Sequence, residues 1–512
     1  MTDSEKFPST GPMMPSSAVT PPQSASPGRK LQSWGWTGFA LFVVLYLWLH
    51  FYLGTQLIHQ TNQDRLNWDQ QHNITLAFRT LERESAPLQE GGGVSELWKR
   101  FPHYTDGVVN PLWPWVAARF TDQDHDRFFE KGKWFNLILA AIFLVVLGTL
   151  AARAFSIPSG ITTILLAGLG AVLPRSVYFQ PETLFYLWLL IAWVCCLTLL
   201  RRNDLWLYGA LGASAALSYL AKGSTLLLLV VFVGITTLRF LIRLLQRPAP
   251  GRPLDTRWSQ QNHFIGMAVM TMTFLMFAGP MLSHVNTHFG SPLHSYPSSW
   301  MWVDSFEEGS QFMVNHPDKR TLDAQTPEER PGAMNYFKHH TAEQMWARLS
   351  DGVKVKLGEF LFPKPTKQNK ARTKPWHELL PNRGLLLFIL LAQVGILGLM
   401  HQIVRRREAE KSGGLRRSES AVWMLLFALG CFAAYSLAYG WYTPVGKGDR
   451  FMLSLYAPMV LTCVWLASRF RRRLLGSTWS VPADMIHAGT HAVIITMVLW
   501  RIKDLLTVPL FD

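Results

Sequence analysis

Long apolar runs recur along most of this chain, and they constrain its fold more than any other feature. The hydrocarbon core of a bilayer is ~30 Å thick, so a helix needs about 20 apolar residues to cross it. Runs of this kind cover residues 36–56, 134–152, 160–176, 183–200, 205–221, 224–242, 264–284, 384–403, 420–440, 452–468 and 486–500. The last run is the shortest, and whether it spans the bilayer stays open. The pattern predicts an all-α polytopic membrane protein with about eleven transmembrane helices.

Composition and cysteine placement agree with this fold class. Only 16% of the residues are charged, compared with about 25% in ordinary soluble domains. The first apolar run is too long for the core of a signal peptide, so we predict that it spans the membrane. No disulfide framework is predicted, because all four cysteines lie inside apolar runs, at Cys195, Cys196, Cys431 and Cys463.

Basic residues in the short loops predict the orientation of the helices, because such residues are enriched on the cytoplasmic side. They follow the fourth, sixth, eighth and tenth runs, in clusters that contain Arg201, Arg243, Arg405 and Arg471. The N-terminal segment carries Lys30 and falls on the same side, in the cytoplasm. These clusters account for the net charge of +15 without a nucleic-acid partner. The partner they predict is the lipid bilayer.

Two long segments, 57–133 and 285–383, then fall on the non-cytoplasmic side. An amphipathic helix along the membrane surface is predicted in the first, from apolar residues at helical spacing at Ile74, Ala77, Phe78 and Leu81. The predicted parts are a disordered cytoplasmic tail over 1–33, an N-terminal transmembrane catalytic module over 34–300, an external region over 301–383 and C-terminal transmembrane helices over 384–512.

Charged and polar motifs gather at span ends on the non-cytoplasmic side, where ionisable groups near hydrocarbon are costly. In chain order they are Asp64 and Asp69, Asn110-Pro111-Leu112, Pro181-Glu182, Lys222-Gly223-Ser224, and Lys447 followed by Arg450-Phe451. Their order resembles that of the GT-C superfamily of membrane glycosyltransferases, in particular the protein O-mannosyltransferases and the lipid A aminoarabinose transferases. The resemblance covers roughly 55–300 and 430–470.

This resemblance implies an inverting transferase that takes a sugar from a polyprenyl-phosphate carrier on the non-cytoplasmic face, in a bacterial inner membrane. The acceptor, a protein, lipid or glycan, is left open. Because the lipid phosphate is already a good leaving group, the reaction needs one carboxylate as base and cations that hold the phosphate. The expected catalytic residues are Asp69, with Asp64 as the competing base, and Glu182. The expected substrate-binding residues are Lys222, Lys447, Arg450, Asn110, Tyr296 and Asp304.

Each candidate also has a structural explanation. Asp69 could cap the amphipathic helix, and Glu182 could cap the fourth span. Lys222 and Arg450 could be anchors whose charged ends reach the membrane surface. An aromatic belt at the interface explains the tryptophans near Tyr296 without any role in sugar binding.

A metal site and a transport function are the remaining alternatives. Acids at 122, 124 and 126 beside His125 are a pattern that can bind a divalent cation, but the dipole of the following helix explains them as well. We therefore expect no cofactor. A lipid-linked sugar flippase or another transporter should carry charges in the middle of its spans. Here the acids lie at span ends, which favours the enzyme.

Overall fold

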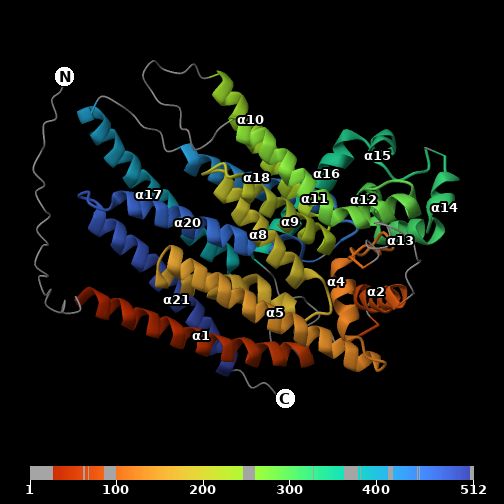
Figure 1. Ribbon diagram of the computed structural model, residues 1–512, viewed down its shortest axis with the longest axis horizontal. Coiled ribbons are helices and arrows are strands. Elements are labelled where there is room, and N and C mark those ends of the chain that lie inside the picture. Colours follow the sequence, from red (N-terminus) through yellow and green to blue (C-terminus); the bar gives the residue numbers. More distant parts are fainter. Residues whose placement is uncertain are drawn as a thin grey trace, which may run out of the picture.

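Helices form the regular secondary structure throughout the described part of the computed structural model (Figure 1). That part comprises residues 27–60, 64–66, 68–85, 100–245, 260–326, 328–362, 379–380, 382–412, 419–446, 448 and 450–507. Within it, 10 helical segments are long and apolar enough to cross a membrane. The chain is therefore an all-α multi-pass membrane protein, as the sequence predicts.

The ten segments agree with ten of the predicted spans. They are α1 (Pro27–Gln60), α5 (His125–Ala154), α6 to α7 (Ile157–Ser176), α8 (Glu182–Leu199), α10 (Thr225–Leu245), α11 (Gln260–Phe289), α17 (Arg383–Ser412), α18 (Glu419–Trp441), α19 (Arg450–Leu453) with α20 (Tyr456–Leu474), and α21 (Ser480–Thr507). The run at 486–500 thus belongs to a long helix. The run at 205–221 forms α9 (Leu205–Ala221), a shorter apolar helix, so the count of eleven spans is not confirmed.

The two predicted external segments meet at one end of the bundle, which we call the outer end. In Figure 1, α2 (Trp68–Ser85) and α4 (Leu112–Ala117) lie there beside the short helices of the second segment. These are α12 (Tyr296–Ser299), α13 (Phe306–Asn315), α14 (Lys319–Asp323) and α15 (Ala333–His339). The amphipathic helix predicted in the first segment is confirmed as α2, whose Ile74 and Ala77 are buried.

The helix ends that flank the predicted cytoplasmic loops lie at the opposite end, which we call the basic end. Nη1 of Arg239, on α10, donates to the carbonyl oxygen of Leu200 at 2.8 Å. Nη2 of Arg469, on α20, donates to Oγ of Ser420 at 2.5 Å. These contacts join the ends of α8, α10, α18 and α20. The expected tail over 1–33 lies outside the described residues up to 26, and α1 begins at Pro27.

One further helix, α16 (Ala342–Leu361), packs lengthwise against α18 and carries part of the second external segment to the spans. The two helices approach closely where Gly352 faces Gly440. A Cβ atom added to Gly352 would lie 1.9 Å from the carbonyl oxygen of Gly440. Only glycine permits this approach, which brings the buried face of α16 to the start of α19.

Candidate functional site

An ion pair at the outer end joins the first external segment to the last loop of the chain. Asp69 is the second residue of α2, and Arg450 is the first residue of α19. Nη1 of Arg450 donates to Oδ2 of Asp69. Nε2 of Gln180 approaches the same oxygen at 3.5 Å. These hydrogen bonds engage the Asp69 carboxylate with side chains from other segments.

A second ion pair lies beside the first. Glu182 is the first residue of α8 and is 3% exposed. Nζ of Lys222, the residue that follows α9, lies 3.3 Å from Oε1 of Glu182. Burial lowers the pKa of Lys222, and the nearby Glu182 carboxylate partly offsets this effect. Within the described part of the chain, the second carboxylate oxygen of Glu182 is buried without a hydrogen-bond donor. That oxygen can accept a hydrogen bond from a bound molecule.

Three cations surround the ring of Phe451. Nζ of Lys222 and Cζ of Arg450 each lie 5.1 Å from its centroid. Nζ of Lys356, on α16, lies 5.4 Å from it. Lys356 is fully buried, forms an ion pair with Glu359 at 3.1 Å and donates to the carbonyl oxygen of Gly448 at 3.2 Å. Each of these cations has a carboxylate partner, and three such side chains near one ring can bind an anion that takes the place of a carboxylate. We call Asp69, Glu182, Lys222, Lys356 and Arg450 the charged cluster.

Two buried amides hold the loop that precedes Glu182. Nε2 of Gln70 donates to the carbonyl oxygen of Asp64 at 3.0 Å, and Oε1 of Gln70 accepts from the Phe179 amide at 3.2 Å. Nδ2 of Asn136 donates to the carbonyl oxygen of Gln180 at 3.0 Å. These contacts fix the start of α8 against α2, and so they position the two ion pairs relative to each other.

Lys356 and Gln180 were not among the predicted site residues. A signal for Lys356 exists in the sequence, because it follows Gly352 by four residues and precedes Phe360 by four. This spacing places all three on one face of α16, and they are the buried residues of that helix. A lysine on the apolar face of an amphipathic helix is unusual enough to mark it as a candidate.

The remaining predicted residues lie around the charged cluster or away from it. Asn110 donates through Nδ2 to the carbonyl oxygen of Tyr219, close to Lys222 in the chain. Asp64 is exposed and accepts at 2.8 Å from the amide of Leu66. Its carboxylate serves a local turn, and the structure does not bring it to Arg450. Lys447 lies outside the described residues.

Tyr296 and Asp304 connect elements of the outer end. The Tyr296 hydroxyl donates to the carbonyl oxygen of His316 at 2.5 Å. Asp304 accepts from Nη1 of Arg348 at 3.0 Å and from Nε2 of His340 at 2.9 Å. The pKa of Asp304 falls below its usual value because hydrogen bonds from Tyr336 and His340 outweigh burial, which alone would raise it. The contacts of Tyr296 and Asp304 therefore lie outside the charged cluster.

The acidic pattern near His125 forms separate contacts at the start of α5. Asp124 caps this helix and accepts from the amide of Asp126 at 3.0 Å. Asp122 pairs with Lys131 at 2.6 Å. Among the described residues, no group of three or more histidine, cysteine, aspartate or glutamate side chains is arranged to hold a metal ion.

No family model matches the chain, and no curated protein matches its sequence. Two features therefore bear on its function, the chemistry of the charged cluster and the order of the motifs along the chain.

Proposed function

We propose that the chain is an inverting GT-C-type glycosyltransferase. It moves a sugar from a polyprenyl-phosphate carrier to an acceptor on the non-cytoplasmic face of a bacterial inner membrane, with its N-terminus in the cytoplasm. The observation that carries this proposal is the charged cluster, in which Asp69 pairs with Arg450, and Arg450 lies near the ring of Phe451 together with Lys222 and Lys356. Glu182, Lys222 and Arg450 lie at the ends of apolar helices, where a lipid phosphate can reach them.

The reaction needs few groups. The acceptor hydroxyl oxygen attacks C1 of the sugar, and the bond from C1 to the phosphate oxygen breaks with inversion. Asp69 accepts the hydroxyl proton as general base. The departing phosphate gains one negative charge as it leaves. Lys222, Lys356 and Arg450 are suited to stabilise that charge, which is the usual role of preorganised cations in group transfer.

The ion pair of Asp69 with Arg450 gives the two residues linked roles. A phosphate offers the guanidinium a better charged, bidentate partner than a single carboxylate oxygen does. Binding of the donor would therefore draw Arg450 away from Asp69. The carboxylate would then be able to accept a proton beside the bound sugar, so binding of the donor would prepare the base.

Glu182 has a positioning role in this proposal. Its Oε1 atom holds the Lys222 ammonium at 3.3 Å, and its buried Oε2 atom can accept a hydrogen bond from a sugar hydroxyl. A buried carboxylate next to a buried ammonium keeps that ammonium charged. Lys222 is thereby available to a phosphate.

A lipid-linked sugar flippase or other transporter is the second candidate, and one observation favours it. A buried polar network crosses α6, α17 and α21 within the spans. Oγ1 of Thr162 lies 2.9 Å from Nδ1 of His491, and Nε2 of Gln393 lies 3.2 Å from Nδ1 of His487. Polar and ionisable groups inside membrane-spanning helices are typical of transport pathways.

Incubation of the purified chain with a labelled polyprenyl-phosphate sugar separates the two candidates. Membranes that contain candidate acceptors are added, and free polyprenyl phosphate is measured over time. The transferase predicts its release, with label appearing in the acceptor. Movement of intact donor between leaflets, without release, would support the transporter and contradict the transferase.

A further inference from the structure

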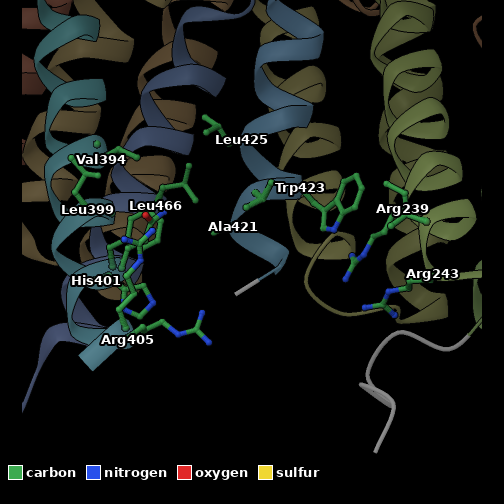
Figure 2. A pocket seen from close by; sticks show the side chains of 17 residues that line it. Arg239, Arg243, Val394, Leu399, His401, Arg405, Ala421, Trp423, Leu425 and Leu466 are labelled. Carbon is green, nitrogen blue, oxygen red and sulfur yellow. The ribbon is translucent and has the colours of Figure 1, made fainter. Parts of the chain in front are cut away.

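A cavity of about 800 Å³ opens at the basic end, far from the charged cluster. It lies between α10, α17, α18 and α20 (Figure 2). The ion pairs proposed for sugar transfer take no part in it. A molecule bound in this cavity would therefore not depend on the proposed transferase activity.

The walls of this cavity are mostly apolar and partly open to the side of the bundle. Leu399 and Val422 line it and are 61% and 57% exposed. Gly395 also lines it, and a Cβ atom added there would meet nothing within 4 Å. An apolar space with exposed leucine and valine walls, within a membrane span, suits a hydrocarbon chain.

The rim of the cavity is strongly basic. Figure 2 shows Arg405 and His401 on one side of the opening and Arg239 and Arg243 on the other. Arg406 also lines it, and no aspartate or glutamate is among the described lining residues. Arg239 is buried and supports the backbone of the loop after α8. Arg243 and Arg405 are partly exposed, so their guanidinium groups can contact a ligand.

We propose that this cavity binds an anionic phospholipid. Its phosphate would lie between Arg243 and Arg405, which arginine suits through its planar, multiply donating guanidinium group. One acyl chain would lie along Leu399 and Val422. Basic pockets between transmembrane helices on the cytoplasmic side are a known means of binding anionic headgroups. The positive charge of the rim and the apolar walls together favour this occupant over a free anion or a neutral lipid.

Binding is measured on the delipidated full-length chain by native mass spectrometry, with phosphatidylglycerol as the probe. Phosphatidylcholine tests the need for net negative charge, and glycerol phosphate tests the need for acyl chains. We expect phosphatidylglycerol to bind at least about tenfold more tightly than either. Equal binding of phosphatidylcholine, or equal binding of glycerol phosphate, would overturn the proposal.

Two pairs of variants locate the site. Arg243→Gln with Arg405→Gln should weaken phosphatidylglycerol binding by at least about tenfold. The control, Arg407→Gln with Arg472→Gln, removes two exposed charges from the same end of the bundle outside the cavity and should leave binding unchanged. Equal losses in both double variants would indicate general attraction to the basic end and would overturn the assigned site.

The apolar wall is tested by filling it. Gly395→Leu places a side chain into the cavity and should reduce phosphatidylglycerol binding at least about tenfold, because it occupies the space for the acyl chain. Gly234→Leu is the matched control, since Gly234 is also exposed on a spanning helix with nothing within 4 Å of an added Cβ atom. Unchanged binding in Gly395→Leu would contradict the proposed lipid path.

Discussion

The Asp69 carboxylate is paired with the Arg450 guanidinium although 381 positions separate the two residues. The carbonyl oxygen of Arg450 also accepts from the Tyr186 hydroxyl of α8 at 3.2 Å. The pair thus ties α2 to the start of α19 and to α8. In the proposed mechanism a donor phosphate replaces Asp69 as the partner of Arg450. Arg450 then acts in donor binding and Asp69 in proton transfer, so a substitution at each residue tests a different step.

Arg450→Ala should weaken binding of the polyprenyl-phosphate sugar by about 10- to 100-fold, the loss expected for a charged hydrogen bond. Arg450→Lys should restore only part of it, because a lysine lacks the bidentate geometry. Titration with the donor measures the donor affinity of both variants. Arg65→Ala is the control, since Arg65 pairs with the exposed Asp126 at the same outer end. Unchanged donor affinity in Arg450→Ala would leave Arg450 as an anchor only.

Lys356→Met should lower the transfer rate by about 10- to 100-fold, because it removes a buried charge near the departing phosphate while keeping the length of the side chain. Lys354→Met is the control on the same helix, where Lys354 is exposed and pairs with Asp351. The steady-state transfer rates of the two variants are measured with labelled donor. Equal rates in the two variants would remove Lys356 from the site.

The orientation of the helices is tested by cysteine labelling with a membrane-impermeant reagent. Glu307→Cys lies on α13 at the outer end, and Arg407→Cys lies at the end of α17. We expect labelling of the first from the non-cytoplasmic side and of the second from the cytoplasmic side only. The four native cysteines are buried, so background labelling of these residues should be low. Labelling of both from one side would refute the predicted topology.

The spans were predictable because length and hydropathy alone identify a membrane-crossing helix. Asp69, Glu182, Lys222 and Arg450 were predicted from their places near span ends together with the resemblance to the GT-C superfamily. Their pairing was not, because contacts between residues hundreds of positions apart leave no local pattern. The short α9 shows the limit of the span count, since its 17 residues fall at the edge of the length criterion.

Lys356 and Asp304 show why the external segment was harder to interpret. Both lie in a region of mixed polarity, where the sequence does not show which charges are buried. Lys356 enters the cluster only because Gly352 lets α16 approach α18. Asp304 instead bonds Arg348, whose Nε donates to the carbonyl oxygen of Trp441 at 3.0 Å. The same residue types can bind substrate or join helices, and packing decides which.

Asp106 should make the stability of the first external segment dependent on pH. Burial alone would raise its pKa, but the hydrogen bond from His72 and the amides of Val108 and Val109 hold the pKa below the usual value. A carboxyl with a lowered folded pKa stabilises the fold above its unfolded pKa of about 3.9. That stabilisation is lost as the pH falls through the lowered value.

Asp106→Asn should therefore lower the melting temperature at pH 7, with a loss of about 1–3 kcal/mol in the free energy of unfolding. The difference from the wild-type protein should narrow below about pH 4. Thermal melting of both proteins between pH 7 and pH 3 provides the comparison. A difference that stays constant over this range would show that the charge of Asp106 does not stabilise the fold.

The most direct measurement of the central claim is the transfer rate of Asp69→Asn at saturating donor, beside donor binding and thermal melting of the same variant. Asparagine keeps the shape of aspartate but cannot accept the proton. We predict a fall in rate of about 10²- to 10⁴-fold without weaker donor binding, because the carboxylate competes with the donor phosphate for Arg450, and with the variant still folded at the assay temperature. A full transfer rate in Asp69→Asn would contradict the account and exclude Asp69 as the base.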